Sequence, residues 1–123
     1  MSIKLFDSEL KIMEVIWSRG DLSAKAIAEI LKESIGWNKN TTYTVIKKCL
    51  EKGAIERREP NFICHALINK EDVQGSEVDE LVNKLFGGSA ELLFASLVGR
   101  KKLNRDMLDK LKHIVDEAGG ERK

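Results

Sequence analysis

The chain has 123 residues, of which 42% are hydrophobic and 33% are charged, a composition typical of a folded protein rather than a disordered one. Lys and Arg number 21 against 20 Asp and Glu, and the resulting net charge of +1 argues against a simple polycation. Two cysteines, Cys49 and Cys64, are too few for a disulfide scaffold or a four-thiolate zinc site. No apolar run approaches the roughly 18 residues of a membrane-spanning helix, and the N-terminus lacks a secretory signal. We therefore expect a cytoplasmic protein with no membrane insertion.

Two helices are predicted at the start of the chain. Apolar residues at helical spacing follow Asp7 and Ser8, and either of these two side chains is suited to cap the first helix. Ser23 is suited to cap a second helix at about residues 24–34, which carries its own apolar stripe. The two helices are separated by a short polar turn.

A third helix and a hairpin come next. The helix is predicted over residues 41–52 and ends before Gly53, because glycine readily adopts the left-handed conformation that follows many helices. Residues 54–58 and 62–68 suit extended strands, and residues 59–61 form a Pro-Asn turn between them. The predicted inward stripe of the third helix consists of Thr42, Val45, Ile46, Cys49 and Leu50.

The rest of the chain is predicted to be helical. Gly87-Gly88 and the polar joint at residues 99–102 divide it into three helices, and Ser89 and Asn104 are suited to cap the second and third of these. The order of three helices, a hairpin and a helical tail predicts a mainly α fold with a small β-hairpin. We expect a winged helix-turn-helix DNA-binding domain at residues 1–70 and a helical dimerisation domain at residues 71–123.

The distribution of charge favours nucleic acid as a partner. Residues 37–58 contain six Lys or Arg and two Glu, a net charge of +4, although the whole chain is almost neutral. Neutralisation of phosphates is the main sequence-independent term in DNA binding, and small polar side chains can contact phosphates or bases. The alternative is a solvated helix face with no partner. The candidate DNA-binding residues are Lys39, Asn40, Thr41, Tyr43, Thr44, Lys47, Lys48, Arg57, Arg58 and Asn61.

The helical tail predicts a homodimer. Its apolar stripes must be buried, either against the first domain or against a second copy of the chain, and a dimer also presents two recognition helices to two half-sites. The alternative is a monomer with a folded-back tail. The candidate dimerisation residues are Val78, Leu81, Val82, Leu85, Phe86, Leu93, Leu97, Met107, Leu108, Leu111, Ile114 and Val115.

The sequence resembles the penicillinase-repressor family of winged-helix transcriptional regulators (BlaI, MecI and CopY type) along nearly its whole length. Residues 10–17 (LKIMEVIW) resemble the family's first helix, and residues 21–27 (DLSAKAI) resemble the start of its second. Residues 40–55 (NTTYTVIKKCLEKGAI) resemble its recognition helix and the step into the wing. Residues 84–89 (KLFGGS) resemble the family's Leu-Phe/Tyr-Gly-Gly joint, the most specific of these matches.

This resemblance implies a repressor that binds a palindromic operator as a homodimer. The helix at residues 41–52 would recognise the operator, and a short wing at residues 57–62 would lie along the flanking backbone. In β-lactam-sensing members a membrane sensor-protease triggers cleavage in the C-terminal domain. The resemblance therefore implies such a protease as a candidate partner of this chain. The equivalent position falls near Ser96-Leu97, where the best-known members have Asn-Phe, so proteolysis and another release mechanism both stay open.

Other departures concern the operator and the inducer. Tyr43 and Lys48 stand where the family often has Arg, so the operator sequence is expected to differ because the bidentate guanidinium fork is absent. The wing is short and lacks a Gly-Arg tip. The paired Cys-x-Cys motifs of the copper-responsive members are absent from the sequence, which makes copper sensing by that route unexpected.

Catalysis and metal binding find little support in the sequence. Cys64 and His65 are adjacent on a predicted strand and point to opposite faces, which disfavours a shared metal or a nucleophile pair. Neither a Gly-rich phosphate loop nor a zinc-ligand spacing is present, so we expect no enzyme and no cofactor. The stronger rival is a winged helix used as a protein-interaction module, which would expose apolar side chains where a repressor exposes Lys47, Lys48 and Arg57.

Overall fold

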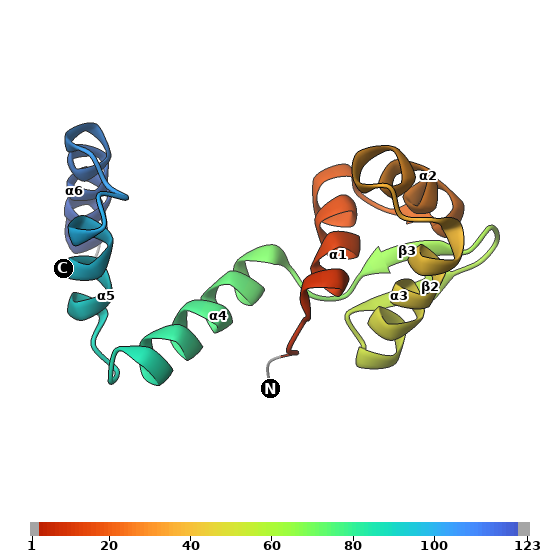
Figure 1. Cartoon of the computed structure of the whole chain (residues 1–123), viewed down its shortest axis with the longest axis horizontal. Coiled ribbons are helices and arrows are strands. Elements are labelled where there is room, and N and C mark those ends of the chain that lie inside the picture. Colours follow the sequence, from red (N-terminus) through yellow and green to blue (C-terminus); the bar gives the residue numbers. More distant parts are fainter. Residues whose placement is uncertain (1–2, 121–123) are drawn as a thin grey trace. The chain divides into compact units, whose positions relative to one another are not determined.

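The computed structural model describes residues 3–120, with side chains to residue 118, and divides into two compact units, Met1–Glu77 and Val78–Lys123. The first unit contains three complete helices, a small sheet and the start of a fourth helix (Figure 1). The helices are α1 (Asp7–Arg19), α2 (Ala24–Ile35) and α3 (Lys39–Lys52), and the strands are β1 (Leu22–Ser23), β2 (Ile55–Arg58) and β3 (Ile63–Ala66). The mainly helical class with a small β-hairpin is therefore confirmed.

The sheet has one strand more than the predicted hairpin. β3 lies between β1 and β2 and pairs antiparallel with both, with Leu22 opposite Cys64 and Arg57 also opposite Cys64 on the other side. The two residues of β1 carry no strand pattern of their own. They become a strand because β3 passes beside the turn that precedes α2.

Local capping explains where most helices begin and end. The Ser23 hydroxyl accepts a hydrogen bond from the Ala26 N–H at 3.1 Å, which confirms the predicted cap of α2. Asn38 Oδ1 accepts from the Thr41 N–H at 2.8 Å, so α3 begins at Lys39, two residues before the predicted start. After α3, Gly53 adopts a φ of +79°, as expected for a glycine that follows a helix.

The predicted cap of α1 is wrong. Neither Asp7 nor Ser8 precedes the helix, because α1 begins at Asp7 and its N-cap residue is Phe6. Instead, Glu9 reaches back, and its Oε1 accepts a hydrogen bond from the Phe6 N–H at 2.8 Å. A carboxylate in the first turn replaces the missing cap because it satisfies a free backbone donor and suits the positive end of the helix dipole.

The hydrophobic core of the first unit joins all three helices to the sheet. Ile12, Met13, Ile27, Ile46 and Ile55 are fully buried. The predicted inward stripe of α3 is confirmed for Thr42, Val45, Ile46 and Cys49, which are buried, whereas Leu50 is half-buried. Burial of this stripe fixes which face of α3 turns toward solvent.

The second unit contains most of α4 (Lys70–Leu85) together with α5 (Ala90–Gly99) and α6 (Arg105–Gly120). Ser89 accepts from the Leu92 N–H at 3.2 Å and Asn104 accepts from the Met107 N–H at 2.8 Å, which confirms both predicted caps. The start of α4 belongs to the first unit, where Val73 is buried and Lys70 pairs with Glu14 at 3.3 Å. The predicted domain boundary at residue 70 thus falls at the first residue of α4, and residues 121–123 of the predicted region lie outside the described part.

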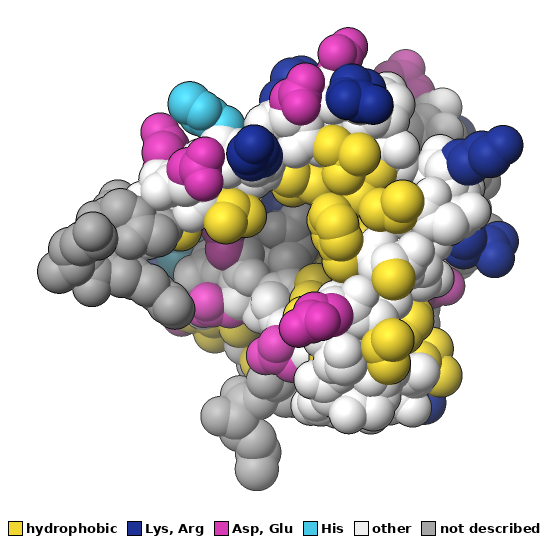
Figure 2. Space-filling model, turned by 90° about the vertical axis from the view of Figure 1, so that its left-hand side faces the viewer, with side chains coloured by type: hydrophobic (Ala, Val, Ile, Leu, Met, Phe, Trp, Pro, Cys, Tyr) yellow, Lys and Arg dark blue, Asp and Glu magenta, His cyan; other side chains and the backbone are white. Residues whose placement is uncertain are grey.

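The helices of the second unit leave their apolar side chains largely uncovered in the single chain. Within residues 78–118, no side chain is classed as buried. Figure 2 shows hydrophobic side chains gathered among charged ones on the face that it draws. Of the candidate dimerisation residues, Val82, Phe86, Leu93, Leu108 and Leu111 are half-buried, and the exposed ones are Val78, Leu81, Leu85, Leu97, Met107, Ile114 and Val115.

Among residues 3–120, no single helix is long and apolar enough to cross a membrane, and only α4 and α5 taken together, across the bend between them, meet that test by length and composition.

Candidate nucleic-acid interface

The solvent-facing side of α3 collects most of the predicted DNA-binding residues. Because the apolar stripe faces the core, the opposite side of the helix turns polar and basic side chains outward. Tyr43 is half-buried at the border between the two sides. The exposed residues of this polar face are Lys39, Asn40, Thr41, Thr44, Lys47 and Lys48.

The lysines of this face keep their charge available. Within the described residues, Lys47 and Lys48 form no ion pair, and the charge of Lys48 only helps to lower the pKa of Glu9. Lys39 Nζ lies 5.6 Å from the centre of the Tyr43 ring, a distance that suits a cation–π contact. All three ammonium groups can therefore meet an anionic partner without first breaking a carboxylate pair.

The wing arginines differ from the lysines because each already has an acidic partner. Arg57 pairs with Glu59, and its guanidinium carbon lies 3.8 Å from the centre of the Phe62 ring. Arg58 Nε lies 2.7 Å from Glu56 Oε2, and its Nη1 lies 3.8 Å from Asp21 Oδ2. Both arginines are exposed, but a phosphate would have to displace these carboxylates.

An ion pair between half-buried Lys52 and buried Glu9 fixes the C-terminal end of α3. Lys52 Nζ donates to Glu9 Oε1 at 2.6 Å and to the carbonyl oxygen of Lys4 at 2.7 Å. Burial raises the pKa of Glu9, but the hydrogen bonds from Lys52 and the Phe6 N–H outweigh it, and the pKa lies below its usual value. Lys52 was counted in the positive charge of residues 37–58, and the sequence patterns did not predict this pair. The available signal was an acidic residue in the first turn of α1, which does not identify a partner.

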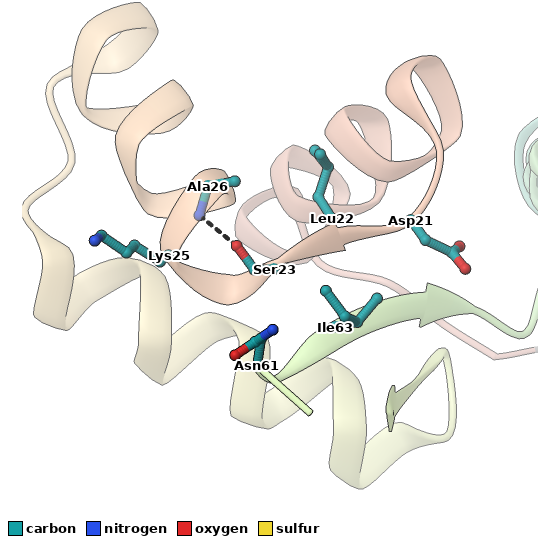
Figure 3. Close-up of a pocket in the computed structure, with 7 residues that line it drawn as sticks. All are labelled: Asp21, Leu22, Ser23, Lys25, Ala26, Asn61 and Ile63. Carbon is teal, nitrogen blue, oxygen red and sulfur yellow. Dashed lines mark hydrogen bonds between the residues drawn. The ribbon is translucent and has the colours of Figure 1, made fainter. Parts of the chain in front are cut away.

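A shallow groove lies between the start of α2 and the turn of the wing (Figure 3). Exposed Lys25 contributes to it from the start of α2 and exposed Asn61 from the turn of the wing, and Ser23, whose hydroxyl caps α2, also lines it (Figure 3). Asn61 was a predicted site residue, whereas Lys25 was not, because nothing in its neighbourhood in sequence marks it. The groove is lined by Asp21, Leu22, Ser23, Lys25, Ala26, Asn61 and Ile63.

The cysteines and histidine of the first unit have structural roles. Cys64 is buried, whereas the half-buried His65 on the other face of β3 pairs through Nδ1 with Asp21 at 2.8 Å. Burial raises the pKa of Cys49 to about 12 and that of Cys64 to about 11. Nowhere in residues 3–120 do three His, Cys, Asp or Glu side chains gather as metal ligands.

Comparison with known sequences decides the family. The model of the penicillinase repressor family matches residues 5–117. The chain belongs to this family. Penicillinase repressors are DNA-binding transcriptional repressors rather than enzymes, so the predicted resemblance and class of function are confirmed.

Named relatives extend over nearly the whole chain. The methicillin resistance regulatory protein MecI of Staphylococcus aureus strain N315 is 25% identical over 116 residues, which cover 93% of this chain and 94% of the relative. A penicillinase repressor of Staphylococcus aureus is 22% identical over 117 residues, which cover 94% of this chain and 93% of the relative.

Solved structures confirm the winged-helix fold. The DNA-binding domain of the repressor BlaI matches with a TM-score of 0.53 at 24% identity, over 57% of this chain and 88% of that one. The monomeric form of Bacillus licheniformis BlaI, solved in complex with the blaP half-operator, matches with a TM-score of 0.51 at 24% identity, over 58% of this chain and 90% of that one.

Proposed function

We propose that this penicillinase repressor binds a palindromic DNA operator as a homodimer, with α3 in the major groove and the short wing along the flanking backbone. The observation that carries this proposal is the exposed basic face of α3, on which Lys47 and Lys48 have no ion pair within the described residues. Structural similarity to a BlaI that was solved with a half-operator supports it. Such a protein acts on promoters, so we place it in the cytoplasm.

The chemistry of the polar face suits duplex DNA. Lys39, Lys47 and Lys48 would neutralise phosphates and release counterions, which supplies the sequence-independent part of the affinity. Asn40 and Thr44 carry short hydrogen-bonding groups that can reach base edges in the major groove. Large apolar side chains that are more than one-third exposed are absent from α3, and this disfavours a role as a protein-interaction module.

Selection of duplexes from a random-sequence pool by the purified full-length chain tests this proposal. We expect an inverted repeat whose half-sites are spaced by about one helical turn or a multiple of it. Replacing Lys48 by Ala should weaken binding and lower the slope of log affinity against log salt by about one per subunit. The matched control is Lys110→Ala, another exposed lysine but on α6. Equal effects of the two substitutions would contradict the assignment of α3.

The homodimer rests on the uncovered apolar side chains of the second unit. Leu85, Ile114 and Val115 are 67%, 60% and 66% exposed in the single chain. Burial of such surface contributes about 25 cal/mol per Å², and a second copy supplies identical surface by symmetry. We therefore assign dimerisation to residues 78–115.

Sedimentation of the full chain tests the dimer. Val115→Asp should shift the mass toward the monomer, because it places a charge on the apolar surface. Lys110→Asp introduces the same side chain at an exposed polar position of α6 and should leave the mass unchanged. A dimer that tolerates Val115→Asp as well as Lys110→Asp would refute this part of the proposal.

A membrane sensor-protease is proposed as a further partner on the family resemblance alone. Ser96 and Leu97 lie inside α5, so the backbone there must unwind before it can enter a protease site. The intact mass of the chain recovered from cells before and after induction distinguishes the two release mechanisms. A shortened fragment supports proteolysis, and a full-length chain released from DNA excludes it.

A further inference from the structure

Phe62, at the end of the wing turn, has a backbone conformation that a large side chain rarely adopts. Its φ is +52°, in the left-handed region that favours glycine, and Asn61 before it has a φ of +74°. Asn tolerates this region, whereas a bulky residue adopts it only where its surroundings hold it there. The surroundings of Phe62 therefore call for an explanation.

Contacts from two other elements and from its own turn hold Phe62. Its carbonyl oxygen accepts from the Ala24 N–H, at the start of α2, at 2.9 Å. Its own N–H donates to Glu59 Oε1 at 3.3 Å. Its ring lies 6.1 Å from the Tyr43 ring of α3 at an interplanar angle of 87°, which is the edge-to-face geometry that aromatic pairs prefer.

The Phe62 ring also contacts the guanidinium of Arg57 in the wing. The Arg57 guanidinium lies 3.8 Å from the centre of the Phe62 ring, and Lys39 Nζ lies 5.6 Å from the centre of the Tyr43 ring. Two cations thus stand at the ends of a row whose middle consists of two adjacent aromatic rings. This row runs from α3 into the wing and, among the described residues, links the Arg57 side chain to α3.

We propose that Phe62 and Tyr43 form an aromatic clasp that holds the wing against the recognition helix, and that Phe62 is a positioning residue that sets Arg57 for its phosphate contact. Without the Phe62 ring, the Arg57 side chain keeps its ion pair with Glu59 at the start of the wing turn, and loses its side-chain link to α3 among the described residues. With the ring, the cations of α3 and the wing keep a fixed spacing, so one duplex can meet both. This inference rests on the proposed DNA binding.

A double-mutant cycle on the full-length chain tests the clasp, with the inverted-repeat duplex that selection returns as the probe. In the otherwise unchanged chain, Arg57→Ala should lower the salt slope by about one per subunit. Between about 50 and 200 mM salt, Arg57→Ala should therefore lose about 3.5-fold less affinity per subunit than the unchanged chain does. In the Phe62→Leu background, which keeps an apolar side chain but removes the ring, Arg57→Ala should change affinity by less than about twofold.

Controls separate positioning from a general loss of structure. Lys47 lies on the polar face of α3 but outside the row of rings and cations. Lys47→Ala should therefore lower the salt slope equally in the unchanged chain and in the Phe62→Leu background. Phe62→Tyr keeps the ring and should restore the effect of Arg57→Ala. Phe62→Gly also removes the ring but suits the left-handed backbone, so it should likewise abolish the effect of Arg57→Ala, and it replaces Phe62→Leu if that variant folds poorly.

Each outcome decides something different. If Arg57→Ala has the same effect with and without the Phe62 ring, or none in the unchanged chain while the duplex binds, the clasp is refuted and the proposed function stands. If the unchanged chain selects no duplex, the proposed function itself fails, and this inference fails with it.

Discussion

Replacement of Lys52 by Met removes the counterion of a buried carboxylate while keeping a side chain of similar length. Glu9 is 1% exposed, and Lys52 is its only charged hydrogen-bonding partner among the described residues. Loss of one member of a buried pair typically costs 3–5 kcal/mol, because the remaining charge is left without compensation. We expect about 3 kcal/mol at neutral pH, at the low end, since the Lys52 side chain is 27% exposed and water can partly replace it.

The cost should depend on pH with a defined sign. In the unchanged chain the pKa of Glu9 lies below its usual value of 4.5, so its contribution to stability is present above that pH and is lost as pH falls through the folded-state pKa. Without Lys52, its hydrogen bond and charge no longer lower the pKa of Glu9, while burial still raises it, so we expect a higher folded-state pKa than in the unchanged chain. Less stability is then gained as pH rises through that pKa. The difference between the two chains should therefore grow from acid toward neutral pH.

Urea unfolding followed by tryptophan fluorescence measures this difference, because both tryptophans, Trp17 and Trp37, lie in the first unit. The comparison is made at one protein concentration, since a dimer couples stability to concentration. In a Glu9→Gln background, Lys52→Met should cost little and show no pH dependence. A cost that stays constant from about pH 4 to neutrality would refute this reasoning and point instead to the lost contact between Lys52 Nζ and the Phe6 ring, whose centre lies 4.0 Å away.

Three further outcomes are expected. Because burial raises the pKa of Cys49 to about 12 and of Cys64 to about 11, neither thiol of the native chain should react with a disulfide reagent at about pH 8 until urea is added; fast native labelling would contradict their burial. Gly75→Ala, inside α4 with open space around the added methyl, should stabilise the chain by up to about 1 kcal/mol in urea unfolding; destabilisation would show that α4 needs the glycine. Glu59→Gln should raise duplex affinity by freeing Arg57; an unchanged affinity would exclude Arg57 as a phosphate contact.

Features that depend on neighbouring residues could be predicted from the sequence. The caps at Ser23, Ser89 and Asn104 lie three residues before the N–H groups that they accept, so spacing alone identifies them. The buried stripe of α3 follows from helical periodicity, and it fixes the opposite polar face without further information. Most residues of the candidate interface could be predicted from the sequence for this reason.

Features that join distant segments could not be predicted. Lys52 and Glu9 are 43 residues apart, and the pairing partners of a surface lysine are not encoded in its local sequence. Asp21 reaches His65 across 44 residues only because β1 pairs with β3. The left-handed backbone of Phe62 is likewise a consequence of contacts from other elements, since no sequence rule places a phenylalanine there.

These distant partners change what the positive charge of residues 37–58 means. Of its six basic side chains, Lys52, Arg57 and Arg58 are paired with carboxylates in the fold, whereas Lys39, Lys47 and Lys48 have no carboxylate partner among the residues that the structure describes. If only the unpaired lysines meet phosphates, a dimer neutralises about six and its salt slope is about −5. If both wing arginines exchange their carboxylates for phosphates, the slope steepens toward about −9. The salt slope of the full chain therefore measures whether the wing joins α3 on DNA or only stabilises the fold.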